Sequence, residues 1–260
     1  MTTATYEGER RTPAFGGLNL TYLGLEVRRI LRNRRTLFFI LIMPAVFFLL
    51  FGLPQKGQTL DNGEPVVGYI MISLAVYGAM VANTSCGGMV AVERALGWSR
   101  QLRLTPLRPS AYIATKVLSA MVLGLTAVLV EFVVGAVSGV RMPAHVWLLA
   151  GLAAWVGSLV FAAFGLFIGY LVPAENVMQF LGPILALLAM FGGLFVPLEV
   201  LPHAFQEIAK WTPVYGIGTI ARSPLTGEAV TMTEVANVIG WTLAFSLGAA
   251  RLFRRDTARV

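Results

Sequence analysis

Glu131 is the side chain in this sequence whose chemistry is hardest to explain as packing. It stands inside the apolar run 128–134. A carboxylate near the centre of a membrane helix costs about 2.5–3.5 kcal/mol on insertion scales, so it should face protein or water. One interpretation is a role in handling substrate or protons. The others are a neutral carboxyl hydrogen-bonded to a neighbouring helix, or a position nearer the outer interface.

A second group of polar residues lies in the apolar run that precedes Glu131. It contains Asn83, Thr84, Ser85 and Cys86 in succession. Asn83 and Ser85 could line a substrate pathway together with Glu131. Small polar residues pack between membrane helices about as often as they line a pathway, so both interpretations stay open.

No catalytic or metal-binding pattern accompanies these residues in the sequence. One cysteine, Cys86, and two histidines, His145 and His203, leave no internal disulfide and no multi-cysteine metal site. The sequence has no phosphate-binding loop, no nucleophile elbow and no His-Glu-x-x-His zinc motif. We therefore expect that the chain is not an enzyme and binds no cofactor. If it transports a molecule against a gradient, the energy must come from a partner protein or from ion coupling.

The polar segment after the second apolar run is the most informative stretch. It begins Glu93-Arg94 and places Leu96, Trp98, Leu102 and Leu104 among basic residues before Thr105-Pro106 stops the helix. A helix with an apolar edge suits a groove in another protein, and a connector that lies along the membrane is the alternative. We expect Glu93 to pair with an arginine of an N-terminal helix.

The composition requires that most of the chain lies in a membrane. Hydrophobic residues make up 57% and charged residues 13%, and mean hydropathy is +0.73. A soluble chain of this size cannot hide so much apolar surface from water. We predict an all-α integral membrane protein with six transmembrane helices. The spans are about 36–53, 66–90, 112–139, 145–171, 178–196 and 235–253, with a cytoplasmic insert at 93–111 and an external hairpin at 197–214. Two Gly-x-x-x-Gly patterns, at residues 135–139 and 165–169, would allow close helix contacts.

Basic residues predict the orientation of these spans. Of 20 Lys and Arg residues, all but Lys56, Arg141, Lys210 and Arg222 fall in three clusters on one side. The positive-inside rule therefore predicts cytoplasmic N- and C-termini, with tails at 1–17 and 254–260 and the first expected to be flexible. Nucleic-acid binding is not expected, because no readable motif accompanies the charge. Residues 18–35 are predicted to form an amphipathic interfacial helix, with Leu20, Leu23, Val27, Ile30 and Leu31 on one face and Arg28, Arg29 and Arg32 turned elsewhere.

Two stretches carry a resemblance to a known family. Glu93, Arg94, Gly97, Leu102, Thr105, Pro106, Leu107 and Lys116 fall on the pattern of type-2 permeases of ATP-binding-cassette exporters. Residues 193–202, followed by Trp211-Thr212-Pro213, are similar to the external hairpin of that family. The six-span order and the N-terminal amphipathic helix match as well, so the resemblance covers nearly the whole chain.

The resemblance implies a permease subunit in the cell membrane that exports an amphiphile, such as an antibiotic or a lipid-like molecule. Its partners would be two copies of an ATPase subunit, which hold ATP and Mg²⁺, and a second permease, either another copy or a paralogue. It implies ATPase coupling by Glu93, Arg94, Gly97, Leu102, Leu104, Thr105, Pro106 and Leu107, and a re-entrant hairpin broken by Pro197, Pro202 and Pro213. A proton-coupled secondary transporter and a lipid-modifying membrane enzyme are the alternatives.

Overall fold

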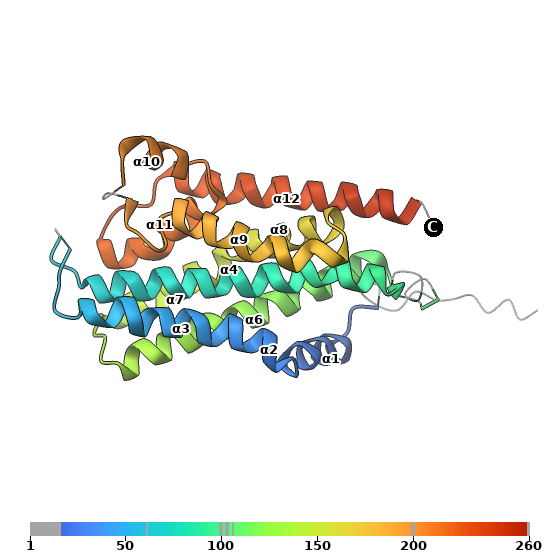
Figure 1. Cartoon of the computed structure of the whole chain (residues 1–260), viewed down its shortest axis with the longest axis horizontal. Coiled ribbons are helices and arrows are strands. Elements are labelled where there is room, and N and C mark those ends of the chain that lie inside the picture. The colour runs from blue at the N-terminus through green and yellow to red at the C-terminus, as the bar shows by residue number, and fades with distance from the viewer. Residues whose placement is uncertain are drawn as a thin grey trace, which may run out of the picture.

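The computed structural model describes residues 17–60, 62–98, 101, 104–105, 107–198 and 201–258. Within these ranges the chain is helical, with an isolated bridge between Thr59 and Pro65 and no β-strand. The long helices run side by side along one axis (Figure 1). Six helical segments are long and apolar enough to cross a membrane. The predicted fold class, all-α with six spanning helices, is therefore confirmed.

The first spanning segment, Phe38–Gln55, is irregular. It joins π-helical turns at Phe38–Ile42 and Phe48–Gly52 to the short helix α3 (Met43–Phe47). Pro44 has no backbone N–H and its ring crowds the preceding turn, which disturbs the regular hydrogen-bond pattern. The other elements are α1 (Leu20–Leu31), α2 (Arg34–Leu37), a 3-10 turn (Leu53–Gln55), α4 (Val66–Ala95), α6 (Pro109–Val137), α7 (Ala144–Gly157), α8 (Leu159–Leu171), α9 (Ala174–Phe191), α10 (His203–Ala209), α11 (Pro213–Thr226) and α12 (Met232–Ala258).

Helix α4 is the central helix of the bundle and packs against α6, α8, α9 and α11. Its contact with α8 depends on glycine. A Cβ on Gly165 would lie 2.5 Å from the Thr84 carbonyl oxygen, and one on Gly169 would lie 2.6 Å from that of Gly87. The Gly-x-x-x-Gly pattern at 165–169 therefore lets the two backbones touch, as small residues do in membrane helix pairs.

The pattern at 135–139 serves two separate needs. A Cβ on Gly135 would meet the Met71 sulfur at 2.1 Å, so this glycine admits a side chain of α4. Gly139 has a φ of +82° and forms the turn after α6. Only Gly135 of this pair lies at a helix contact.

The fourth span is two helices in line. α7 ends at Gly157 and α8 begins at Leu159, with Ser158 between them. The Ser158 hydroxyl donates to the Trp155 carbonyl at 2.5 Å and accepts from the Asn83 amide of α4 at 2.7 Å. A polar side chain that bonds back to the preceding turn competes with the helical hydrogen bonds, and Asn83 of α4 holds Ser158 at this interruption.

The fifth span begins and ends earlier than the sequence predicted. α9 begins at Ala174, directly after Pro173, and includes Glu175, which lies between the predicted spans 145–171 and 178–196. An acidic residue in the first turn is favoured by the helix dipole. α9 ends at Phe191 instead of 196, because Gly193 turns the chain with a φ of +75°. A side chain there would be strained and would strike Leu198.

The two ends of the bundle differ in charge. We call one the Arg-rich end: it holds α1, the segment between α4 and α6, and the C-terminus of α12 (Figure 1). The opposite end holds α10, α11 and the loop before α4 (Figure 1). At the Arg-rich end α4 continues to Ala95 and α6 starts at Pro109, so the link between them is shorter than the predicted 93–111.

Candidate functional site

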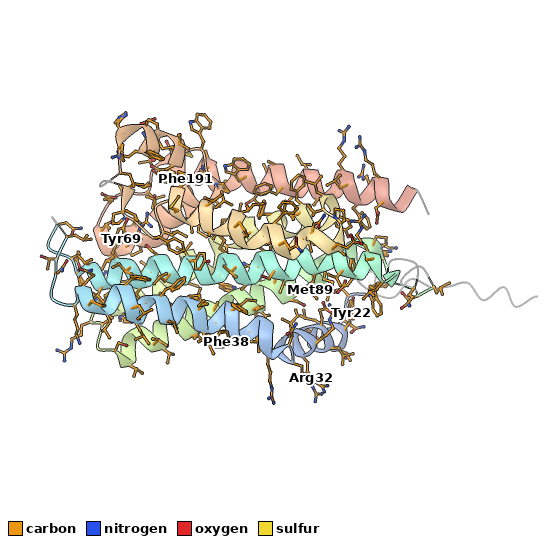
Figure 2. The ribbon with its side chains drawn as sticks, viewed as in Figure 1. Tyr22, Arg32, Phe38, Tyr69, Met89 and Phe191 are labelled. Atoms are coloured by element: carbon orange, nitrogen blue, oxygen red, sulfur yellow. The ribbon has the colours of Figure 1, made fainter. Side chains whose placement is uncertain are left out.

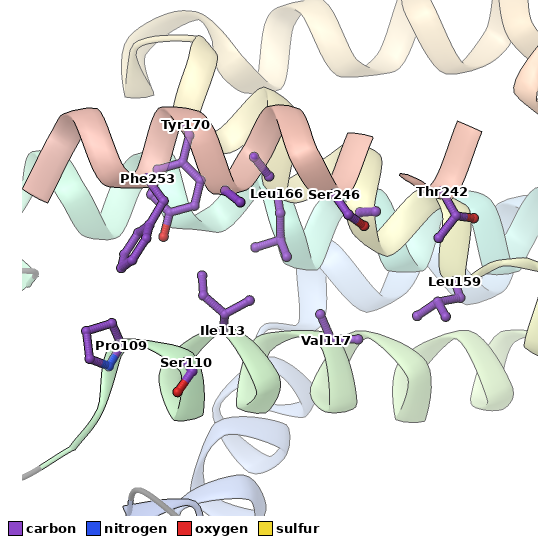
Figure 3. Close-up of a pocket in the computed structure, with 13 residues that line it drawn as sticks. Pro109, Ser110, Ile113, Val117, Leu159, Leu166, Tyr170, Thr242, Ser246 and Phe253 are labelled. Atoms are coloured by element: carbon purple, nitrogen blue, oxygen red, sulfur yellow. The ribbon is translucent and has the colours of Figure 1, made fainter. Parts of the chain in front are cut away.

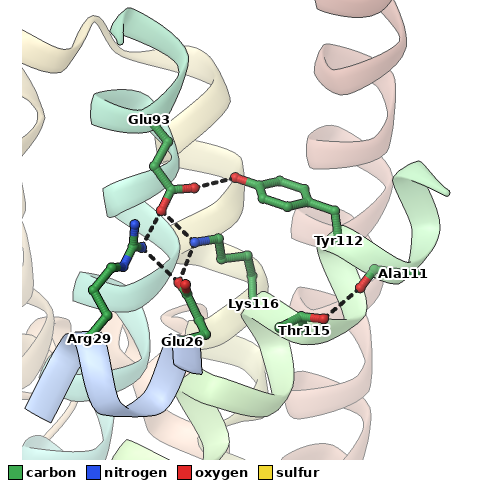
Figure 4. A network of polar contacts seen from close by, with 7 residues as sticks. All are labelled: Glu26, Arg29, Glu93, Ala111, Tyr112, Thr115 and Lys116. Atoms are coloured by element: carbon green, nitrogen blue, oxygen red, sulfur yellow. Dashed lines mark hydrogen bonds and ion pairs between the residues drawn. The ribbon is translucent and has the colours of Figure 1, made fainter. Parts of the chain in front are cut away.

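Glu93 is the centre of a polar cluster at the Arg-rich end of α4 (Figure 4). One carboxylate oxygen accepts from Lys116 Nζ of α6 at 2.5 Å and from the Arg29 guanidinium of α1. The other accepts from the Tyr112 hydroxyl of α6 at 2.5 Å. The predicted pairing of Glu93 with an arginine of the N-terminal helix is therefore present, and the residue is Arg29.

Glu26 of α1 completes the cluster. Its carboxylate accepts from Lys116 Nζ and from the Arg29 guanidinium, the latter at 2.8 Å. Two acidic and two basic side chains thus share one site, which we call the Glu93 cluster: Glu26, Arg29, Glu93, Tyr112 and Lys116. Lys116 is 3% exposed and Glu93 4%. Charges this deeply buried persist only when they are paired and hydrogen-bonded, and here each is.

The cluster explains why α4 remains helical past its charged residues. Glu93 was expected to open a polar insert, but pairing with Lys116 and Arg29 lets it stay in the last turn of α4. Burial opposes the charge on Arg29, but its hydrogen bond and ion pair with Glu93 outweigh that effect and raise the pKa of Arg29. The guanidinium is thus a permanent cation in this site.

The most buried residue of helix α1 is a charged one, Glu26. Asn19 caps its N-terminus by accepting from the Tyr22 backbone N–H at 2.6 Å. Burial and the neighbouring Glu26 raise the pKa of Tyr22 to about 12, so this phenol stays neutral. Arg29 lies off the apolar face of α1 with its side chain 47% exposed, and from there its guanidinium reaches both Glu93 and Glu26.

The other residues predicted for this helix divide between two faces. Leu23, Val27 and Ile30 are half-buried against the bundle. Leu20 and Leu31 are exposed, at 85% and 44%. Arg28 and Arg32 are also exposed, and Arg32 points away from the bundle (Figure 2).

Arg94 extends the connections of α4 to the other side of the bundle. Its guanidinium donates to both carboxylate oxygens of Asp256 in α12, at 2.6 and 3.0 Å. It also donates to the carbonyls of Gly169 and Tyr170 at the end of α8, at 3.1 and 3.2 Å. Two successive residues of α4 therefore hold four helices: Glu93 holds α1 and α6, and Arg94 holds α8 and α12.

The link between α4 and α6 presents apolar side chains at this end. Leu96 is 75% exposed, Leu104 80% and Trp98 39%. Gly97 has a φ of +74° and redirects the chain after α4. The Thr105 hydroxyl accepts from the Leu107 N–H at 3.4 Å. Leu102 and Pro106, also predicted for this site, lie outside the described residues.

A small cavity of about 190 Å³ opens beside the Glu93 cluster. Its walls come from α1, α4 and the first span, and combine charged, polar and apolar side chains. They are Glu26, Arg29, Ile30, Asn33, Ile40, Ser85, Cys86 and Met89. Of the three residues predicted to form a substrate pathway, Ser85 is at this cavity.

The other two pathway candidates face elsewhere. The Asn83 amide donates to the Ser158 carbonyl at 3.0 Å as well as to its hydroxyl, at the junction of α7 and α8. Glu131 is 1% exposed, and neither of its carboxyl oxygens has a hydrogen-bond partner among the described residues. It lies on the face of α6 where Gly124 and Gly135 meet α4. The structure therefore does not bring Asn83, Ser85 and Glu131 to one wall.

At the opposite end, two of the three predicted prolines stand where helices begin. Pro202 precedes α10 and Pro213 is the first residue of α11, a position that suits proline because its missing N–H is not needed. Pro197 lies between α9 and α10. Whether this region enters the membrane without crossing it stays a prediction.

No role was predicted from the sequence for Arg222 of α11, one of the four basic residues outside the three clusters. Arg222 is 5% exposed, donates to the Ser73 hydroxyl at 3.2 Å and the Gly193 carbonyl at 3.1 Å, and lies over the Tyr69 ring. Glu26, Tyr112 and Asp256 were likewise not among the predicted site residues. Tyr112 and Lys116 lie four residues apart on one helix face, and this spacing was the signal in the sequence that pointed to the Glu93 cluster.

Comparisons with known proteins agree on the type of protein. Residues 20–225 match the family model described as ABC-2 type transporter. The chain is also 29% identical over 235 residues to a protein of Bacillus subtilis (strain 168) with the provisional name transport permease YvfS. That match covers 90% of this chain and 96% of the relative.

Proposed function

The chain belongs to the ABC-2 type transporter family, and from this we propose that it is the membrane subunit of an ATP-driven exporter of amphiphilic molecules. Drugs, antibiotics and lipid-like compounds are the substrate class, and efflux would give antibiotic resistance. A separate ATPase subunit, in two copies, supplies the energy and holds ATP and Mg²⁺. The permease itself pairs with a second permease to form the pathway.

The observation that carries this proposal is the junction built by Glu93 and Arg94. A force applied to α1 or to the link after α4 reaches α6 through Lys116 and Tyr112, and reaches α8 and α12 through Arg94. Paired contacts of this kind, buried around Glu93 and partly exposed around Arg94, move as a unit, because separating them leaves charges without partners. Such a junction is what a partner needs in order to move several spanning helices at once.

Exposed apolar residues at the same end give the partner its contact. Leu96, Trp98 and Leu104 are exposed on the link between α4 and α6, where the protein core does not cover them. Apolar side chains held on a short link are suited to an ATPase groove. With the positive-inside rule, this end and both termini are placed in the cytoplasm of a multi-pass protein of the cell membrane.

Co-purification with the ATPase of the neighbouring reading frame tests the coupling role. Leu104→Asp and Leu96→Asp should reduce ATPase retention or uncouple ATP turnover from transport, while insertion and expression stay at the parental level. Gln101→Asp is the matched control, since it adds the same charge to an exposed polar position of the same link. Parental assembly and substrate-stimulated ATPase activity in both leucine variants would contradict the coupling role.

Orientation is tested separately by labelling introduced cysteines in intact cells after replacing Cys86. A cysteine at Leu104 should resist an impermeant thiol reagent, whereas one at Asn62, in the exposed loop before α4, should react. Surface labelling at position 104 would contradict the proposed orientation. The family assignment would not be affected.

A proton-coupled secondary transporter is the second candidate, because Glu131 is a buried carboxyl without a described partner. Transport by Glu131→Gln separates the two. An exporter driven by ATP alone keeps its dependence on the ATPase in this variant. A proton-coupled carrier responds to a proton gradient when no ATPase is present, and Glu131→Gln should lose that response.

A further inference from the structure

The cavity of about 190 Å³ beside the Glu93 cluster differs in its lining from a larger groove of the molecule. That groove, of about 440 Å³, lies between α6 and α12, and its walls are mainly apolar (Figure 3). The smaller cavity combines two charged side chains, Glu26 and Arg29, with Ser85 and with apolar neighbours. Polar groups placed among apolar walls fix the orientation of a ligand, so the smaller cavity is the better candidate for specific binding.

Several polar atoms of the cavity wall have no partner in the part of the chain that the structure describes. Lys116 and Arg29 both donate to Oε1 of Glu26, which leaves Oε2 of this 7% exposed residue unpaired (Figure 4). Both bonds of Arg29, to Glu26 and Glu93, come from Nη2, which leaves Nε and Nη1. The Ser85 hydroxyl is likewise unpaired. The wall thus offers an acceptor, donors and a hydroxyl that the fold does not use.

The charges around the cavity favour a neutral polar group. The two carboxylates of the Glu93 cluster are balanced by Arg29 and Lys116. A cationic group that approached Glu26 would also meet Arg29, and an anionic group that approached Arg29 would also meet Glu26, so each would be repelled by one of the pair. A hydroxyl can donate to the unpaired carboxylate oxygen and accept from the unpaired guanidinium nitrogens. The cavity therefore suits an uncharged group that carries hydroxyls.

The size and position of the cavity indicate that only one end of a ligand enters it. Its volume of about 190 Å³ is below the roughly 300–1,000 Å³ of sites that enclose a whole small molecule. The cavity reaches from α1 to Ile40, near the start of the first spanning segment, and Ile30 and Met89 add apolar surface. It therefore lies near the depth at which the polar surface of a bilayer gives way to hydrocarbon. An amphiphile at this depth would have its polar end in the cavity and its tail in lipid.

We propose that this cavity binds the neutral, hydroxyl-bearing end of the amphiphilic substrate, with the tail in the leaflet at the Arg-rich end. The inference rests on the exporter function proposed above and names the class of head group that this exporter takes up. Glu26 and Arg29 belong to the Glu93 cluster, which joins α1, α4 and α6. Occupancy of the cavity is therefore linked to the junction through which the ATPase would act.

Thiol protection tests the head-group preference in the full chain, held in nanodiscs of phosphatidylcholine. Met89→Cys in a Cys86→Ala background places a single cysteine in the cavity wall, to be labelled with N-ethylmaleimide. The probes are mono-oleoyl glycerol, oleyl phosphate and oleyl trimethylammonium, which share a tail and differ in the charge of the head. Mono-oleoyl glycerol should half-protect the thiol at about a tenfold lower concentration than either charged probe, the effect of one or two hydrogen bonds.

Two controls separate recognition of the head from binding of the tail. Ser246→Cys, in the groove between α6 and α12 and the same background, is the control reporter, and there the three probes should act alike. Ser85→Ala removes the hydroxyl from the cavity wall and should raise the half-protection concentration of mono-oleoyl glycerol at position 89 about fivefold. Ser110→Ala is its matched control, because it removes an exposed hydroxyl from the other groove, and it should behave as the parent reporter does.

Three results would overturn the proposal. Absence of protection at position 89 by every probe would mean that the cavity holds water only. Equal protection by the three probes would reduce the cavity to an apolar site, and preference for a charged probe would contradict the neutral head group.

ATPase activity of the assembled complex separates this inference from the exporter function. An ATPase that responds to amphiphiles while position 89 stays unprotected would overturn the cavity and leave the exporter function standing. Selective protection of position 89 in a chain that assembles with no ATPase would leave the binding site and contradict the exporter function.

Discussion

Glu93 and Glu131 are buried to nearly the same degree, at 4% and 1% exposure, yet their surroundings are opposite. Glu93 receives three donors, from Lys116, Arg29 and Tyr112. Glu131 receives none from the described residues. Burial therefore does not reveal what an acidic residue in a membrane helix does. Its partners do, because a satisfied carboxylate ties elements together and an unsatisfied one is costly unless it has another use.

The two residues also differ in their position along their helices. Glu93 lies in the last turn of α4, where α1 and α6 can supply cations from the Arg-rich end. Glu131 lies deep in α6, on the face where Gly124 and Gly135 contact Asn83 and Met71 of α4. The first position is a joint between helices. The second is a polar group held inside an otherwise apolar contact.

The largest expected effect comes from removing the cation that joins the two acids of the cluster. Lys116→Met leaves Glu26 and Glu93 buried with Arg29 as their remaining charged partner. Breaking a buried pair in this way costs about 3–5 kcal/mol, so thermal unfolding in detergent should shift strongly downward. The exposed Lys56, at the opposite end, gives the control Lys56→Met, which should stay near the parent. Equal shifts in the two variants would show that the cluster is not a structural joint.

The second effect has the opposite sign. Glu131→Leu replaces an unsatisfied buried carboxyl by an apolar side chain of similar size, and should stabilise the protein by about 1–3 kcal/mol. Glu93→Leu is the paired experiment and should destabilise it, because Lys116 then loses one of its two partners. If Glu131→Leu also destabilised the protein, Glu131 would have a partner in the assembled protein that resembles those of Glu93.

A smaller effect is expected where the ion pair is partly exposed to water. Arg94 and Asp256 are 28% and 29% exposed, so Asp256→Asn should cost at most about 1 kcal/mol of stability. Coupling should suffer more than folding, since α12 then loses its charged contact with α4. The check is substrate-stimulated ATPase activity of the assembled complex, measured beside its unfolding temperature. A parental ATPase response would show that coupling does not depend on the Arg94–Asp256 pair, and would leave the contacts of Glu93 with α1 and α6 as the joint.

The smallest change in stability is expected for Glu131→Gln, which keeps the shape of the side chain and removes its ability to ionise. Its unfolding temperature should remain close to that of the parent. Transport should fall if the carboxyl handles protons or substrate, and should be unchanged if it is only packed. Parental transport across the pH range tested would remove the functional interpretation of Glu131.

The sequence determined the class of fold because lipid requires long apolar helices, and such helices can be recognised from composition alone. Six spans, their order, and the pairing of Glu93 with an arginine of the N-terminal helix could all be predicted. Helix ends were less predictable. Gly193 ended α9 early and Pro173 allowed it to start early, since local turn geometry decides the ends within an apolar run.

Only the tertiary structure decided which charges meet. Glu26 and Lys116 are 90 positions apart, and Arg94 and Asp256 are 162 apart. Their pairing depends on how α1, α6 and α12 cross α4. The same crossing brought the Arg29 guanidinium to Glu93, buried Arg222 and left Glu131 without a described partner. Hydrophobic pattern fixes that a helix is buried in lipid, whereas the partner of a single polar side chain is set by helix rotation, which pattern alone does not specify.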